Sequence, residues 1–165
     1  RAYIYIKMLG ETGLRNMTKN AILNANGINN RDDEENWAAR VLRDNQFEDK
    51  CIEFLSKFNL EHKHSVWANN SELELAMIDE TPVVGGIYLA LCIIDPPNKT
   101  VNAIKVKGFL DTVKGEGASR GIFITTGYFS DEAIRSIDEE PVELVDVVSF
   151  ISYLKRFGIY EIPHS

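Results

Sequence analysis

Hydrophobic residues in the first half of the chain follow a helical period and then a strand period. One buried helix face is predicted by residues at offsets of four, seven, eight and eleven: Phe47, Cys51, Phe54, Leu55 and Phe58. Downstream, Ser71–Ile78 alternates polar and apolar residues, whereas Gly86–Ile94 is almost continuously apolar. These patterns predict a half-buried strand followed by a central strand that is covered on both faces.

In the second half of the chain, segments with the helical period of hydrophobic residues alternate with segments that are typical of strands. Its pattern predicts a helix over Thr100–Lys114, a buried strand that begins at Gly121, a short strand over Val142–Val145 and helices capped by Ser130 and Asp146. The expected order is helix, two or three strands, helix, strand, helix, strand, helix. Such alternation is typical of an α/β fold in which a mixed β-sheet is flanked by helices on both faces.

Composition and charge limit the partners of this domain. The 165 residues are 44% hydrophobic and 26% charged, with a formal net charge of −7. An acidic chain binds DNA only through a local basic face, because phosphate contacts need Lys and Arg. The candidate face holds Lys99, Lys105, Lys107, Lys114 and Arg120, with Thr125 and Thr126 as candidate phosphate contacts. A solvated helix face and a strand-terminal turn explain the same residues.

The cysteines and the hydropathy indicate where such a chain resides. Cys51 and Cys92 are expected to be reduced core residues, which suits the cytoplasm or another reducing intracellular compartment. No run of about 18 apolar residues occurs, so we expect no membrane partner.

The N-terminal segment differs from the rest of the chain. Ala2–Gly10 and Gly13–Asn26 resemble a segment of the glycine decarboxylase P protein, a pyridoxal-phosphate enzyme family whose cofactor-binding lysine has no match here. We therefore expect a helical leader over residues 1–27, which is either a fused segment or a helix recruited for packing. A linker follows, and the main domain is expected over residues 32–162. Because the chain begins with Arg1, we expect a fragment or a processed product.

The stretches Asn98–Ala133 and Glu143–Ile159, together with the order of the elements, resemble the Mrr-type restriction endonuclease domain of the PD-(D/E)xK nuclease superfamily. The resemblance covers roughly residues 47–159. It implies hydrolysis of a DNA phosphodiester with a divalent metal, usually magnesium. The family needs an acid on one strand, an acid or glutamine on the next, and a lysine two residues later on the same face.

Two alignments of that motif are possible, and both lose essential groups. In the preferred one, Glu74 replaces the aspartate, and Leu91 and Ile93 occupy the positions of the second acid and the lysine. In the other, Gly85–Ile87 matches the family's Gly-Gly-Ile, and Ile104–Lys107 imitates its strand. The second alignment leaves too short a gap for the family's next helix.

A displaced site is the remaining route to catalysis. Glu48, Glu74 and Asp95 would gather at one end of the sheet with Lys105 or Lys107, and Glu74 and Asp95 would hold magnesium. Three hypotheses follow. The first is a degenerate nuclease domain that needs no cofactor and serves in DNA binding or protein interaction. The second is an active magnesium-dependent endodeoxyribonuclease. The third is a structural docking subunit, in which the N-terminal helices bind a protein partner or a second copy of the chain.

Overall fold

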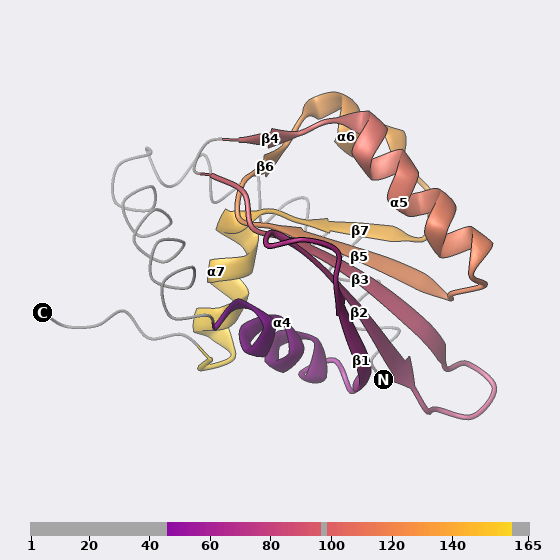
Figure 1. Cartoon of the computed structure of the whole chain (residues 1–165). Helices are drawn as coiled ribbons and strands as arrows, with labels where there is room; N and C mark the ends of the chain where they lie inside the picture. The colour runs from indigo at the N-terminus through magenta and orange to yellow at the C-terminus, as the bar shows by residue number, and fades with distance from the viewer. Residues whose placement is uncertain (1–45, 97–98, 160–165) are drawn as a thin grey trace, which may run out of the picture.

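The computed structural model describes residues 46–96 and 99–159 (Figure 1). The helices in these ranges are α4 (Phe47–Ser56), α5 (Ala103–Gly115), α6 (Asp131–Ser136) and α7 (Val147–Arg156). The strands are β1 (Glu61–Trp67), β2 (Glu72–Asp79), β3 (Gly86–Ile93), β4 (Thr100–Val101), β5 (Arg120–Thr125), β6 (Tyr128–Phe129) and β7 (Val142–Val145). The expected leader over 1–27 and the first residues of the expected domain lie outside the described residues.

Within the described ranges, five strands form one mixed sheet in the order β1-β2-β3-β5-β7, and β4 pairs with β6. The strands β1, β2 and β3 are antiparallel neighbours, whereas β3, β5 and β7 run parallel. Parallel neighbours need crossover connections, and α5 and α6 supply them. The α/β architecture expected from the alternating periods is therefore confirmed.

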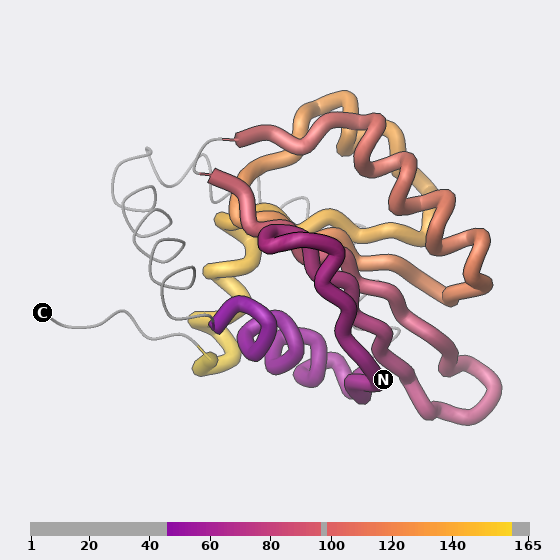
Figure 2. The backbone as a smooth tube through the Cα atoms, viewed as in Figure 1, coloured from indigo at the N-terminus to yellow at the C-terminus, as the bar shows by residue number. Residues whose placement is uncertain are grey.

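Helices cover the two faces of the sheet in pairs. Figures 1 and 2 show α4 and α7 on one face, with α5 and α6 on the other. On the first face, the Phe54 and Phe150 rings meet edge to face with centroids 5.2 Å apart. On the second, Phe123 lies between Phe109 and Phe129 at 5.6 and 5.3 Å. Two separate cores explain why β3 reads as a nearly continuous apolar run.

The ends of the helices follow the expected capping residues, with one correction. The side chains of Ser130 and Asp146 accept backbone hydrogen bonds at the starts of α6 and α7, as predicted. The helix expected from Thr100, however, begins at Ala103, because Asn102 caps it by accepting the Lys105 N–H at 3.0 Å. Thr100 and Val101 instead pair with β6, and neither short strand was predicted.

The two cysteines are core residues, as expected. Cys51 on α4 and Cys92 on β3 are free and fully buried. Burial raises the pKa of the Cys51 thiol well above its usual value, and a hydrogen bond with Cys92 raises it further. The thiol is therefore neutral at physiological pH. No helix of the described residues is long and apolar enough to cross a lipid bilayer.

Candidate active site

The positions expected to carry the nuclease motif lie side by side in the middle of the sheet. In the β2–β3 register, Glu74 is opposite Leu91, and Glu72 is opposite Ile93. Paired residues of antiparallel strands share a face of the sheet, and this face is the one that α5 covers. Leu91 and Ile93 are 8% and 5% exposed and belong to the core beneath α5. Apolar side chains thus occupy both β3 positions that the preferred alignment assigns to the motif.

The positions of the helices and strands decide between the two alignments of the motif. The second alignment requires Ile104–Lys107 to be a strand, but these residues lie within α5. That alignment is therefore wrong. The first alignment places its three residues as the motif requires, on two neighbouring strands and on one face.

The acidic side chains beside the motif positions differ in their surroundings. Glu74 is exposed to solvent. Glu72 forms an ion pair with Lys105, whose Nζ lies 2.5 Å from Oε1. The ammonium of Lys105 on α5 thus reaches the strand that carries Glu74. The sequence suggested Lys105 as a replacement lysine but did not predict its pairing with Glu72, because that contact depends on where α5 lies over β2.

Glu48 does not join Glu74. It lies on α4, which packs against the opposite face of the sheet. Its carboxylate accepts a hydrogen bond from the Trp67 indole at 2.7 Å. In the described structure Glu48 links α4 to the end of β1 rather than lining a site with Glu74.

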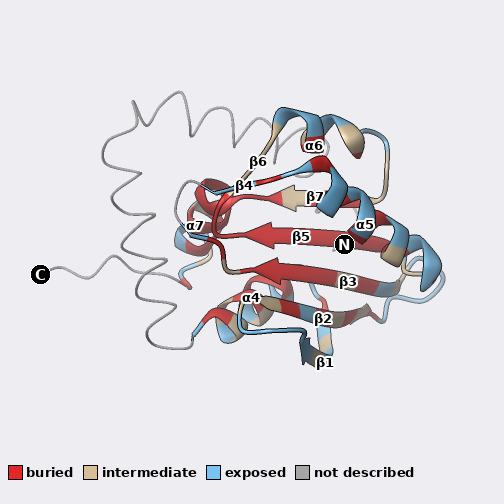
Figure 3. Ribbon diagram, turned by 45° about the horizontal axis from the view of Figure 1, so that its top comes forward, coloured by how far each residue is buried: buried red, intermediate tan, exposed pale blue. Residues whose placement is uncertain are grey.

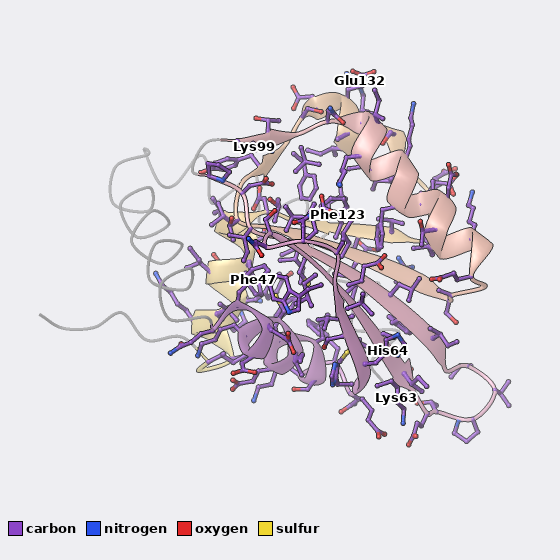
Figure 4. The ribbon with its side chains drawn as sticks, in the orientation of Figure 1. Phe47, Lys63, His64, Lys99, Phe123 and Glu132 are labelled. Atoms are coloured by element: carbon purple, nitrogen blue, oxygen red, sulfur yellow. The ribbon has the colours of Figure 1, made fainter. Side chains whose placement is uncertain are left out.

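Asp95 follows the end of β3 and belongs to a network at the C-terminal ends of β3 and β5. Its carboxylate accepts the hydroxyl proton of Thr125 at 2.8 Å, and Lys99 Nζ lies 3.3 Å from the other oxygen. The Thr126 hydroxyl accepts the Asp95 N–H and donates to the Asp95 carbonyl, each at 2.7 Å. Figure 4 shows Lys99 next to these strand ends.

Both threonines are too buried to contact a DNA phosphate in this structure. Thr125 and Thr126 are 0% and 3% exposed. The Thr125 hydroxyl also accepts the Gly127 N–H at 2.9 Å. A Cβ atom at Gly127 would lie 2.4 Å from the Lys99 carbonyl oxygen, so the turn needs glycine to fit. The strand-terminal turn considered from the sequence therefore accounts for the hydrogen bonds of these threonines.

Most of the expected basic face is neutralised by acidic neighbours. Arg120 forms a buried ion pair with Glu143 at 2.6 Å. Lys114 pairs with Glu140 at 2.9 Å. Lys99 and Lys105 pair with Asp95 and Glu72, as described above. Lys107 is exposed on α5.

The donor set around the motif does not suit magnesium. A hard divalent cation needs several oxygen ligands, and neither Leu91 nor Ile93 supplies one. No group of three or more His, Cys, Asp or Glu side chains in the described ranges is arranged to hold a metal ion. Of the two expected ligands, Glu74 is exposed on β2, whereas Asp95 is buried and bonded to Thr125 and Lys99.

Residues 88–154 match the family model Mrr_cat, described as restriction endonuclease. The match begins in β3 and ends in α7, so it includes Leu91 and Ile93 but not Glu74. This part of the chain is restriction-endonuclease-like. The resemblance predicted from the sequence is confirmed over this span.

Two solved structures resemble the restriction-endonuclease-like domain. The DNA modification-dependent restriction endonuclease AspBHI is 14% identical with a TM-score of 0.49, over 76% of this chain and 36% of that chain. The MspJI restriction endonuclease in complex with a 27-mer oligonucleotide is 16% identical with a TM-score of 0.47, over 87% of this chain and 31% of that chain. The chain spans about a third of the length of each. No curated protein matches it.

Proposed function

We propose that this restriction-endonuclease-like domain does not cleave DNA and serves as a binding module. The observation that carries the proposal is the pair Leu91 and Ile93, buried beneath α5 in the positions of a metal ligand and a lysine. Hydrolysis in this family relies on a metal-activated water and on positive charge near it. Leucine and isoleucine provide neither, and Glu74 alone leaves too few ligands for a hard cation.

The ion pairs of the basic residues support protein interaction over DNA binding. A basic side chain that already contacts a carboxylate must break that contact before it binds a phosphate. Lys99, Lys105 and Lys114 each have such a partner. The net charge of −7 adds a repulsion that every DNA contact must overcome. A protein partner meets no such barrier.

A plasmid assay tests the loss of cleavage. The full chain is incubated with supercoiled plasmid and magnesium or manganese, beside Glu74→Ala and a control, Glu132→Ala, which removes an exposed acid on α6. We expect no nicking by any of the three proteins. Nicking that Glu74→Ala abolishes and Glu132→Ala retains would overturn the proposal. A DNA titration at low salt separates the two binding roles, because phosphate-mediated affinity falls steeply as salt rises.

One contact favours a second candidate function, an active nuclease with a displaced lysine. Lys105 on α5 contacts Glu72, which is opposite Ile93. Its positive charge therefore lies on the face of the sheet that carries Glu74. In such an enzyme Lys105 would replace the motif lysine, and Glu72 and Glu74 would be the acids. The plasmid assay with Lys105→Ala distinguishes this candidate, because nicking would have to depend on Lys105.

A further inference from the structure

One half of the sheet has no helix over it on the α5 side. Figures 1 and 3 show α5 and α6 over the β3–β5–β7 part of the sheet, while β1 and β2 have no described helix in front of them on this face. The pairing register identifies the side chains that point there. Val66 is opposite Glu74, His64 opposite Ala76, and Ile78 opposite Ile87. We call these six residues the open sheet face.

The open sheet face is apolar for a surface of this kind. Val66 is 50% exposed and Ile87 is 43% exposed, and Ala76 and Ile78 are only partly buried. Four of its six residues are apolar and lie on three adjacent strands beside the exposed Glu74 and His64, and such a group of exposed apolar side chains can mark a docking surface. Its one charged member, Glu74, is acidic, and Glu61 flanks it opposite Ile78 in an ion pair with Lys63 at 3.1 Å. An occupant therefore needs an apolar stripe flanked by basic residues.

Residues 1–26 of the same chain have this chemistry. They contain four Lys or Arg residues and one Glu, so their net charge is +3, which leaves −10 for the rest of a chain whose total is −7. Leu14, Met17 and Ala21 follow a helical spacing, and Arg15 and Lys19 flank that stripe. Residues 1–26 thus offer both the apolar stripe and the positive charge that would complement the open sheet face.

The connection is long enough to reach the open sheet face. The described chain enters α4 beside the edge strand, since Glu48 bonds to Trp67 at the end of β1. Residues 27–45 precede that point, and they span about 60 Å when extended and about 28 Å even as one continuous helix. Passing around the edge strand β1 from the α4 layer to the other face requires on the order of 20 Å, twice the spacing of about 10 Å between packed layers. The segment therefore needs no second molecule to arrive there.

We propose that residues 1–26 dock as a helix on the open sheet face of their own chain. The helix completes the cover that α5 and α6 begin, with its apolar stripe on Val66, Ile78 and Ile87 and its basic residues next to Glu74. It would then occupy the surface beside Leu91 and Ile93. This docking does not depend on whether the domain cleaves DNA.

Limited trypsin digestion of the full chain tests the docking, with cleavage after Arg15 and Lys19 followed by mass spectrometry. Docking slows these cuts, because trypsin cleaves only the fraction of molecules in which residues 1–26 are undocked. Glu74→Lys is expected to speed them by roughly tenfold, as is Val66→Asp. Glu132→Lys makes the same charge change on α6, far from β1 in Figure 4, and is expected to leave the rates unchanged. All three positions are exposed, and circular dichroism confirms that the variants fold.

A charge exchange makes the test specific. Arg15→Glu is expected to speed the cut after Lys19, and combining it with Glu74→Lys is expected to restore part of the protection. High salt is expected to weaken the docking. Equal cleavage rates in the wild type and in both variants of the open sheet face would overturn the proposal. Protection that depends on protein concentration would also overturn it, because the segment would then bind a second copy.

Discussion

Two neighbouring sets of residues near the C-terminal ends of β3 and β5 differ in polarity, although Ile93 and Thr125 are register partners there. At the strand ends, Asp95, Thr125 and Thr126 are nearly inaccessible and bond to one another. On the face beneath α5, Leu91 and Ile93 pack into the core. The domain thus combines a buried polar network with apolar residues at the two β3 positions that the preferred alignment assigns to the motif.

The two regions differ in how far a substitution lowers the stability of the fold. A member of the strand-end network cannot change alone, because its buried partners would lose their hydrogen bonds. A ligand or lysine in an active site has no such structural partner, and replacing it by an apolar residue extends the adjacent core. A substitution in the strand-end network is therefore expected to destabilise the fold more than an apolar substitution at an active-site position.

The largest expected effect comes from breaking the strand-end network. Asp95→Ala leaves the Thr125 hydroxyl without its acceptor and Lys99 without its ion pair, so we expect a loss of about 3 kcal/mol in the free energy of unfolding. Urea denaturation measures this loss. Asp131→Ala, on the exposed first turn of α6, is the control and is expected to cost about 0.5 kcal/mol or less. Equal effects at the two sites would mean that the network does not stabilise the fold.

The next effect tests whether the motif position still accepts the family's lysine. Ile93 is 5% exposed, and Ile93→Lys would bury an ammonium in an apolar core, so we expect a loss of about 2–3 kcal/mol. Ile104→Lys introduces the same side chain on α5 at a position that is 81% exposed, and its expected change is within about 0.5 kcal/mol. Urea denaturation of both variants measures the difference. A tolerated lysine at position 93 would indicate a pocket that can still hold the catalytic group.

Much of this fold could be predicted from the sequence, because its signals are local. The alternation of Ser71–Ile78 and the apolar run from Gly86 each report burial directly, and Ser130 and Asp146 mark helix starts by their capping chemistry. The short strands β4 and β6 could not be predicted. Each has two residues, and their pairing depends on a contact between segments that are distant in the sequence.

The candidate site was less predictable, because proximity between strands sets it. The sequence suggested that Glu48, Glu74 and Asp95 gather, but the side of the sheet on which each lies depends on register and on helix placement. Lys105 meeting Glu72 depends on where α5 starts, which Asn102 determines by capping the helix. By contrast, the assignment of Leu91 and Ile93 to the two β3 positions of the motif came from the family resemblance alone.

A pair of glycines tests how tightly α5 packs on the sheet that carries Ile93. A Cβ at Gly121 would lie 2.5 Å from Val113 Cγ2 and 2.8 Å from Phe109, so Gly121→Ala is expected to cost about 1–2 kcal/mol through overpacking. Gly108 lies within α5, and nothing lies within 4 Å of a Cβ there. Gly108→Ala is therefore expected to add about 0.5–1 kcal/mol of helix stability. Thermal unfolding measures both changes in stability. If both substitutions stabilised the protein, or both destabilised it, the result would contradict close packing of α5 at Gly121.

The smallest expected effect concerns Asp146, which caps α7 and is 5% exposed. Burial raises the pKa of its carboxyl, although the Ser149 and Val148 N–H groups oppose the shift. Because the folded pKa lies above the unfolded one, ionisation favours the unfolded state. This contribution therefore destabilises the protein as pH rises from about 4 through the folded pKa. Asp146→Asn keeps a capping oxygen and removes the charge, so the variant should be at least as stable as the wild type at pH 7. Urea denaturation at pH 4 and pH 7 checks the sign, since a variant that loses stability mainly at pH 7 would show that the ionised cap stabilises α7.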